Sequence, residues 1–330
     1  MKKLSNIVEN SYILTKDGYQ YIENILGDNI IWDGYTWKNV IITKNDEPLQ
    51  EKIYYKLLLS DGCEVICNKE HKLYTVDNML SNIYRTTPIN IIKENTLIYK
   101  YNFPLLEGNI ENDLKYPYFL GYIAAYKYNI SNINNENISE EKIKEIYLKI
   151  PNEYINYDHL LKLLDIYSLN FIVPINATIT NKLLWISGLI DINGSITKIK
   201  DGIYLNIIVN SKDFAMKVKY LFNTLGTNPK VLENTEIRKV LLSKNLNEKK
   251  NIQEDTKIRY RLIFNAEDTN KIFLDHNINT YFFIYDKTQY SLDQDINRYI
   301  SIKKITKIKN ILDTYNITNS YTCIINGTLV

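Results

Sequence analysis

The feature that most constrains the fold is a change in the spacing of apolar residues along the chain. Up to about residue 100, short segments rich in β-branched and aromatic residues alternate with turn sequences such as Asp17-Gly18 and Asp61-Gly62, which is typical of an all-β unit. From about residue 115 apolar residues recur every three or four positions, as in helices. From about residue 298 β character returns. The sequence therefore predicts an α+β domain inserted into a split all-β domain.

The individual elements follow from the same patterns. Strands are expected at residues 12–15, 29–32, 40–43, 54–59 and 64–67 in the first β part, and at 300–302 and 321–325 in the second. In the inserted region we expect helices at 118–128, 140–146, 157–167, 182–191 and 214–225. Strands are expected there at 147–150, 195–199, 204–209 and 258–264. Residues 131–137 are predicted to be an Asn-rich loop and residues 233–256 a polar insertion.

Composition excludes several classes of protein. No apolar run approaches the roughly 20 residues of a membrane span, and no apolar stretch follows the N-terminal lysines as in a signal peptide. Three cysteines are too few for a disulfide framework and suit a reducing compartment. We therefore expect an intracellular protein, cytoplasmic or nuclear, with no membrane partner. The formal net charge of +2 neither indicates nor excludes nucleic acid binding.

Two segments of the inserted region place small residues on one face of a predicted helix. They are residues 119–127 (FLGYIAAYK) and 186–194 (ISGLIDING). Gly121, Ala124 and Ala125 on one helix, with Ser187 and Gly188 on the other, allow the two backbones to pack nearly in contact. These segments resemble the two copies of the LAGLIDADG motif of homing endonucleases. Taken alone, the first copy also fits a plain core helix.

The resemblance implies an αββαββα fold repeated about a pseudo-twofold axis, over residues 111–290. The second copy is followed, as the family requires, by a strand, a turn at residues 200–202, a second strand and a helix that closes at Gly226. The first copy is followed by a shorter and less regular stretch.

The β segments resemble the intein (Hint) domain. The segments are residues 12–22 (YILTKDGYQYI), 32–37 (WDGYTW), 59–74 (LSDGCEVICNKEHKLY) and 321–330 (YTCIINGTLV). They are most similar to the inteins of ribonucleotide reductase large subunits. The resemblance implies a Hint-like unit made of residues 1–110 and 291–330, split by the endonuclease-like insert.

Protein splicing needs a nucleophile, a group that polarises the scissile bond and a terminal asparagine. The resemblance places the first nucleophile at Asn6, which cannot undergo an acyl shift; Ser5 serves only if the register slips by one residue. The polarising histidine is retained as His71, but its threonine partner is Asn68. The sequence ends at Val330 without the terminal asparagine. We therefore expect that the protein does not splice.

Cleavage in the LAGLIDADG family requires an acid at the end of each motif to hold a divalent metal. The resemblance places these acids at Tyr126 and Asn193, which are poor ligands for Mg²⁺. Asp191 lies about 200° around the helix from Asn193 and is expected to be a helix-end or packing residue and not a substitute ligand. No cofactor is expected, and Mg²⁺ would be required only if nuclease activity survives.

Binding of double-stranded DNA does not depend on these acids, because it rests on a basic, polar sheet surface. The candidate residues lie on predicted strands and their turn: Lys198, Lys200, Asn206, Arg259 and Arg261. The two arginines alternate with apolar residues and therefore share one strand face. That pattern fits a face in a DNA groove and a solvated face equally. A second basic cluster is interpreted as a solvated surface: Arg298, Lys303, Lys304, Lys307 and Lys309.

Cys63, Cys67 and His71 have a spacing that suggests zinc, but no fourth ligand is evident. Two functions therefore stay open. The first is a degenerate homing endonuclease that still binds DNA. The second is a repurposed structural or assembly protein with protein partners, for example in the virion of a large DNA virus. The bias toward Ile, Asn, Lys and Tyr suggests an AT-rich genome, because AT-rich codons specify these residues.

Overall fold

The computed structural model contains three β-sheets and describes most of the chain. The described residues are 3–46, 51–69, 71–76, 84–99, 101–129, 148, 172–199, 202–241, 252–278, 280, 299–320 and 322–329. The expected helices at 140–146 and 157–167, the expected strand at 147–150 and the loop at 131–137 fall almost wholly outside them. None of the helices that the structure describes is long and apolar enough to cross a membrane.

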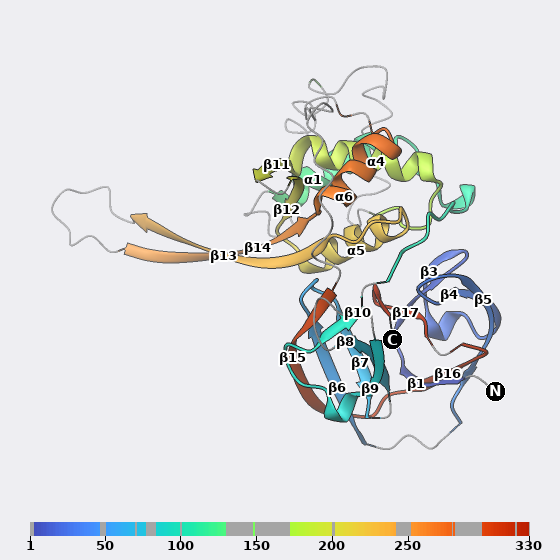
Figure 1. Cartoon of the computed structure of the whole chain (residues 1–330). Helices are drawn as coiled ribbons and strands as arrows, with labels where there is room; N and C mark the ends of the chain where they lie inside the picture. The colour runs from blue at the N-terminus through green and yellow to red at the C-terminus, as the bar shows by residue number, and fades with distance from the viewer. Residues whose placement is uncertain are drawn as a thin grey trace.

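The first sheet has eight strands and joins the two ends of the chain (Figure 1). Its strand order is β1-β16-β5-β4-β2-β17-β18, with β3 beside β2. The bounds are β1 (Lys3–Val8), β2 (Tyr12–Thr15), β3 (Gly18–Tyr21), β4 (Gly27–Trp32), β5 (Trp37–Lys44), β16 (Thr314–Thr318), β17 (Ile324–Ile325) and β18 (Thr328–Leu329). The short 3-10 helix η1 (Ile22–Asn24) follows β3. The expectation that the C-terminal strands complete the β unit is thus confirmed.

The second sheet has six strands in the order β7-β6-β15-β10-β8-β9. It contains β6 (Lys52–Leu59), β7 (Glu64–Asn68), β8 (Lys72–Val76), β9 (Tyr84–Pro88), β10 (Leu97–Tyr99) and β15 (Tyr299–Asn310), with the 3-10 helix η2 (Ile89–Ile91) after β9. The Asp61-Gly62 turn links β6 to β7, as the sequence predicts. β15 pairs with both β6 and β10, so this sheet also draws on both ends of the chain.

The third sheet belongs to the inserted region and has the order β11-β12-β14-β13. Its strands are β11 (Gly194–Ile199), β12 (Gly202–Val209), β13 (Lys230–Leu241) and β14 (Ile252–Ile263). The helices are α1 (Pro117–Asn129), α4 (Ile179–Asn193), α5 (Lys212–Asn223) and α6 (Ala266–Asn270), with the 3-10 turn η3 (Ile110–Asn112) before α1 and the π-helical turn η4 (Lys271–Asp275) after α6. From α4 to α6 the order of elements is αββαββα.

The prediction of a polar insertion at 233–256 is wrong for the residues that the structure describes. Residues 233–241 continue β13 and residues 252–256 begin β14, paired in unbroken register from Lys230–Ile263 to Leu241–Ile252. Figure 1 shows this two-stranded ribbon projecting away from the rest of the molecule. Residues 233–236 (ENTE) and 253–257 (QEDTK) are all polar, so apolar alternation, the usual signal of a strand, is missing from these parts of the sequence.

The inserted region packs tightly against the β unit. Lys219 of α5 forms a buried ion pair with Asp61, in the turn between β6 and β7, at 3.0 Å. Asn176 exchanges two hydrogen bonds with the backbone of Tyr19. Gly62 has a φ of +88°, and a side chain there would collide with the backbone of Val231. The turn sequence therefore serves both the hairpin and the close approach of β13.

Candidate functional site

Helices α1 and α4 pack with their backbones in contact, as the small residues predict. A methyl group added at Gly121 would collide with the carbonyl oxygen of Trp185. One added at Gly188 would collide with the carbonyl oxygen of Tyr118 and the backbone nitrogen of Tyr122. The small residues are therefore required by the packing, and the C-terminal ends of the two helices are brought together.

The end of this helix pair is held by an amide. Asn193 is 7% exposed, and its side-chain Nδ2 donates to the carbonyl oxygen of Ala125 at 3.1 Å. Its Oδ1 is buried and has no hydrogen-bond partner among the described residues. Tyr126 follows Ala125 in α1, but its side chain lies outside the described part of the structure. Asn193 therefore ties the two helices together at the position where the family resemblance places an acid.

Asp191 is also engaged between the helices. Its Oδ2 accepts a hydrogen bond from the hydroxyl of Tyr118 at 2.8 Å. This contact joins α1 to α4.

The donor set around Asn193 does not fit a divalent metal. Mg²⁺ prefers several oxygen ligands, usually including a carboxylate. The described residues hold no group of three His, Cys, Asp or Glu side chains that could bind a metal ion. The nearest acid in sequence, Asp191, is bonded to Tyr118. We therefore assign no metal-dependent step to this end of the helix pair.

The proposed DNA-contacting residues do not share one surface. Directly opposed residues of an antiparallel pair point to the same side of the sheet. Arg261 is opposite Ile208, so both lie on the face away from the buried Leu262. Arg259, two residues earlier, lies on the same face. Lys198 is opposite the buried Ile203 and therefore lies on the other side, at the end of β11.

The remaining two candidates contribute little to that surface in the described structure. Asn206 is 5% exposed, and its amide donates to Thr197 Oγ1 and to the carbonyl oxygen of Tyr204. Lys200 lies outside the described residues. The arginine face of the four-stranded sheet thus consists of Arg259 and Arg261 on β14, together with the neighbouring positions of β12 and β13.

The residues that the intein resemblance assigns to splicing lie on neighbouring elements. Asn6 lies at an irregularity of β1 with a positive φ of 59°, and β1 contacts β7, which ends at Asn68. Oδ1 of Asn68 accepts hydrogen bonds from the backbone nitrogen of His71 at 3.1 Å and from its ring Nδ1 at 3.2 Å. Asn6 accepts a hydrogen bond from the side chain of Asn45 at 3.2 Å. Its amide is thus part of a structural network.

His71 has the properties of a neutral core histidine. It is buried, and its Nε2 has no hydrogen-bond partner among the described residues. Burial lowers the pKa of His71 to about 4, because the protonated ring loses its hydration. With this pKa the imidazole is neutral at physiological pH, and its single ring proton is on Nδ1, where Asn68 accepts it.

The cysteines do not form a metal site with His71. All three are buried free thiols, and burial raises the pKa of both Cys63 and Cys67 to about 12. A zinc site needs at least three ligands, and the described residues hold no group of three His, Cys, Asp or Glu side chains that could bind a metal ion. Within the described residues the zinc interpretation therefore has no support.

Sequence reasoning missed the residues that hold the C-terminal hairpin. Asn326 and Gly327 form its turn, with positive φ angles of 50° and 77°. Asn326 exchanges two hydrogen bonds with the backbone of Tyr12, and Tyr101 donates to the carbonyl oxygen of Gly327 at 2.6 Å. The Asn-Gly dipeptide is a strong hairpin signal and would have identified this turn.

Comparison with known proteins gives one sequence relative and a partial structural likeness. No family model matches the chain. The chain is 25% identical over 245 residues to the ribonucleoside-diphosphate reductase large subunit of Invertebrate iridescent virus 6. The match covers 68% of this chain, which spans only about a quarter of the length of that relative. The crystal structure of the gp41-1 intein matches 29% of this chain and 69% of its own, with 23% identity and a TM-score of 0.24, and a variant of it matches equally.

Proposed function

We propose that the chain is an intein-derived protein with a LAGLIDADG-type insert. In this proposal residues 1–110 and 291–330 form the Hint-like unit and residues 111–290 form the insert. Two observations support it: both β-sheets of the outer unit contain strands from each end of the chain, and a viral ribonucleotide reductase large subunit is similar over part of its length. An intein embedded in such a subunit would account for a match to a quarter of the relative.

The proposed protein neither splices nor cleaves DNA. Asn6 is no nucleophile, and His71 is paired with Asn68 instead of the threonine that the resemblance requires. At the helix ends, the amide of Asn193 bonds to the backbone of the partner helix. The groups that would carry each reaction are therefore committed to holding the fold.

The activity that remains is binding of duplex DNA through the arginine face of the four-stranded sheet. The observation that supports this proposal is the register of β12, β13 and β14: Arg261 is opposite Ile208 and Arg259 is opposite Asn234, so both arginines are on the side of the sheet opposite the buried Leu262. The major groove of B-DNA, roughly 12 Å wide, admits a two-stranded ribbon such as β13–β14. The arginines would contact phosphates or guanine edges alongside it.

A salt titration with matched variants tests DNA binding. Gel shifts on random duplex DNA between 50 and 200 mM salt are compared for the wild type, Arg259→Gln/Arg261→Gln and the control Lys307→Gln/Lys309→Gln. The control residues are exposed and lie on β15 in a different sheet. We expect the arginine pair alone to weaken binding and to reduce the slope of log K against log salt by about 2. Equal weakening by the control variant would contradict the proposed face.

An assembly role is the second candidate function. The buried ion pair between Lys219 and Asp61 favours it, since it fastens α5 of the insert to the turn between β6 and β7. The same experiment separates the two candidates. A protein that gives no shift at 50 mM salt, and that co-purifies with a defined partner from virus-infected cells, would support assembly and would exclude DNA binding.

A further inference from the structure

A cavity of about 550 Å³ lies at the joint between the β unit and the insert, and neither proposed activity uses it. The β unit contributes residues of β2, the end of β3, the start of β7 and the C-terminal hairpin to its lining, and the insert contributes residues of α5 and Ile175. Small-molecule sites usually measure roughly 300–1,000 Å³ and often lie between domains. The size and position of this cavity therefore suit a small ligand.

Three tyrosines line this cavity, and their rings are in contact with one another. The ring centroid of Tyr12 lies 5.0 Å from that of Tyr21 and 5.4 Å from that of Tyr220, with the ring planes inclined by 45° and 55°. Tyr19, which is buried and does not line the cavity, stacks on Tyr12 at 5.0 Å and contacts Tyr220 at 5.1 Å. This second layer supports the lining rings, so the cavity has a preformed aromatic surface.

The phenol groups of this surface also offer hydrogen bonds. Within the part of the chain that the structure describes, the hydroxyl groups of Tyr12, Tyr21 and Tyr220 have no hydrogen-bond partner. Burial raises the pKa of Tyr12 to about 12 and the pKa of Tyr220 well above its usual value of 10.0, because a buried phenolate loses its hydration. These two hydroxyl groups therefore keep their protons, and each can both donate and accept.

The charged groups around the cavity neutralise one another. Its lining includes two cations and two anions. Glu64 pairs with Lys212 at 2.5 Å, and Asp213 pairs with Lys217 at 2.8 Å. A charged ligand would meet a like charge as readily as an opposite one. The cavity therefore favours an uncharged ligand.

The remaining chemistry of the lining favours a flat ring. Met216 and Ile175 add apolar surface to that of the tyrosines, and a methionine sulfur makes favourable contacts with aromatic rings. Aromatic rings attract one another in stacked or edge-to-face arrangements, and nucleobases stack on tyrosine side chains. A heteroaromatic ring also carries donors and acceptors at its edge, which the phenol hydroxyl groups can match.

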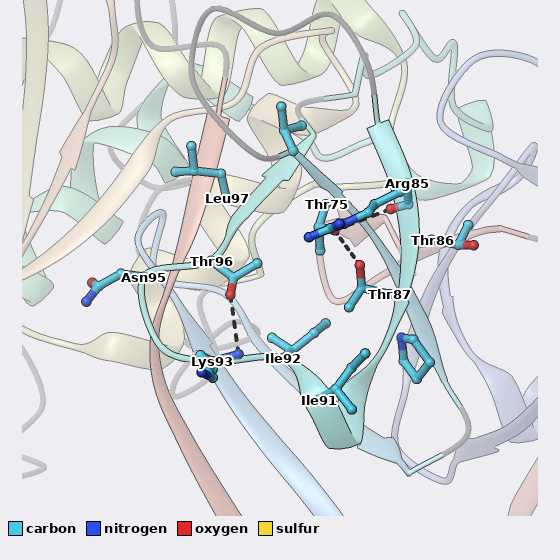
Figure 2. A pocket seen from close by; sticks show the side chains of 12 residues that line it. Thr75, Arg85, Thr86, Thr87, Ile91, Ile92, Lys93, Asn95, Thr96 and Leu97 are labelled. Carbon is cyan, nitrogen blue, oxygen red and sulfur yellow. Dashed lines mark hydrogen bonds between the residues drawn. The ribbon is translucent and has the colours of Figure 1, made fainter.

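A larger cavity in the β unit lacks such a convergence of groups. It has a volume of about 750 Å³ and lies among β8, β9 and β10. Figure 2 shows Arg85 beside the Thr75–Thr87 pair and Lys93 on the side of Ile91. The two cations of its lining lie on different sides of the hollow, so no single ligand chemistry follows from this cavity.

We propose that the tyrosine-lined cavity binds an uncharged heteroaromatic ligand, a nucleobase or a nucleoside. The flat ring of the ligand lies against the aromatic surface at Tyr21 and Tyr12, and its polar edge forms hydrogen bonds with the hydroxyl groups of Tyr12 and Tyr220. This site is independent of the arginine face, which belongs to the four-stranded sheet of the insert.

Calorimetry on the full chain tests the site with the four ribonucleosides, ribose and choline as probes. We expect saturable binding of at least one nucleoside below millimolar concentration. Ribose should bind at least tenfold more weakly because it has no aromatic ring, and choline because it carries a charge. If no nucleoside binds by about 10 mM, or if choline binds as tightly as the best nucleoside and thus marks a cation–π site, the proposal is wrong.

Two further probes identify the ligand. The free base of the best nucleoside separates the two sources: equal affinity indicates a nucleobase, and tenfold weaker binding indicates that the sugar is also contacted. N-acetyltyrosine amide represents an aromatic side chain of a protein partner. Tighter binding of this amide than of every nucleoside would show a peptide site and overturn the proposal.

Variants then locate the binding. Tyr21→Ala should weaken the best nucleoside about tenfold, as loss of a stacking ring does, and Tyr220→Phe about fivefold, because it retains the ring and loses one hydrogen bond. Tyr35→Ala is the matched control, because Tyr35 is 52% exposed, compared with 46% for Tyr21, and does not line the cavity. Unchanged affinity in both cavity variants, or equal weakening by Tyr35→Ala, would place the binding elsewhere and contradict the site.

Discussion

Lys219 of α5 donates a hydrogen bond to Asp61 across 3.0 Å, and both side chains are almost fully buried. The same ammonium group also donates to Asn228 Oδ1 and to the carbonyl oxygen of Pro229. Asn228 and Pro229 belong to the inserted region, whereas Asp61 belongs to the β unit and lies 158 positions from Lys219 in the chain. Without this pairing, each of the two charges would be buried at the joint between the units with no opposite charge beside it.

Removing the ammonium group should therefore weaken both units at once. We expect Lys219→Ala to lower the free energy of unfolding by about 3–5 kcal/mol, because Asp61 stays buried without its partner. Lys217→Ala is the control: Lys217 pairs with Asp213 on the exposed side of the same helix, where such pairs contribute about 0.5 kcal/mol. Urea denaturation measures both variants, and similar losses for the two would contradict the buried pairing.

The contact between α1 and α4 predicts a second stability effect. Gly121→Ala places a methyl group on the backbone of Trp185, so the helices must separate, at a cost of about 3 kcal/mol. Gly27→Ala is the comparison, because a methyl group there meets nothing within 4 Å. Gly27 has a φ of +92°, so its change costs only about 1–2 kcal/mol of backbone conformation. Thermal unfolding should rank the two variants in that order.

The sequence predicted the elements whose signal lies within a single short segment. The strands at 12–15 and 64–67 combine β-branched residues with neighbouring turns, and each lies within one residue of its expected bounds. The helix pair was predictable from glycine and alanine spacing, because only small residues allow backbones to touch. These patterns are local, so one segment carries the whole signal.

The missed features depend on partners that are distant in sequence. A lysine in a helix is ordinarily exposed, and nothing near Lys219 in the chain indicates that it pairs with Asp61. The side of the sheet on which Lys198 lies depends on its pairing with Ile203, and a shift of one residue would reverse it. Asn206 is polar, but its hydrogen bonds to neighbouring strand residues make burial tolerable.

The burial of His71 predicts a pH dependence of stability. The pKa of His71 is about 4 in the folded protein and about 6.5 in the unfolded chain. The unfolded state therefore binds the proton first as the pH falls, so stability is complete above pH 6.5 and declines toward pH 4. We expect a loss of about 1.5 kcal/mol between pH 6.5 and pH 5.

Urea midpoints across this range, compared with two variants, isolate the histidine. His71→Gln should remove most of the slope, because glutamine does not titrate. His276→Gln is the matched histidine substitution outside the core, since His276 is only partly buried and bonds the carbonyl oxygen of Leu225. A slope that survives His71→Gln would assign the pH dependence to carboxylates instead.

Asn193 provides a test that links the fold to the proposed loss of cleavage. Asn193→Asp replaces the amide donor with a carboxylate that faces the carbonyl oxygen of Ala125 in a buried position. The expected cost is about 2–3 kcal/mol, compared with about 1 kcal/mol for Asn193→Ala, which removes the hydrogen bond without burying a charge. Because the second acid position is Tyr126, the single aspartate should give no plasmid nicking with Mg²⁺ or Mn²⁺. The double variant Asn193→Asp/Tyr126→Asp supplies both carboxylates and is the change from which nicking is expected. Nicking by the wild type that disappears in Asp191→Ala would instead show that Asp191 is a metal ligand and that the amide at 193 does not mark a lost site.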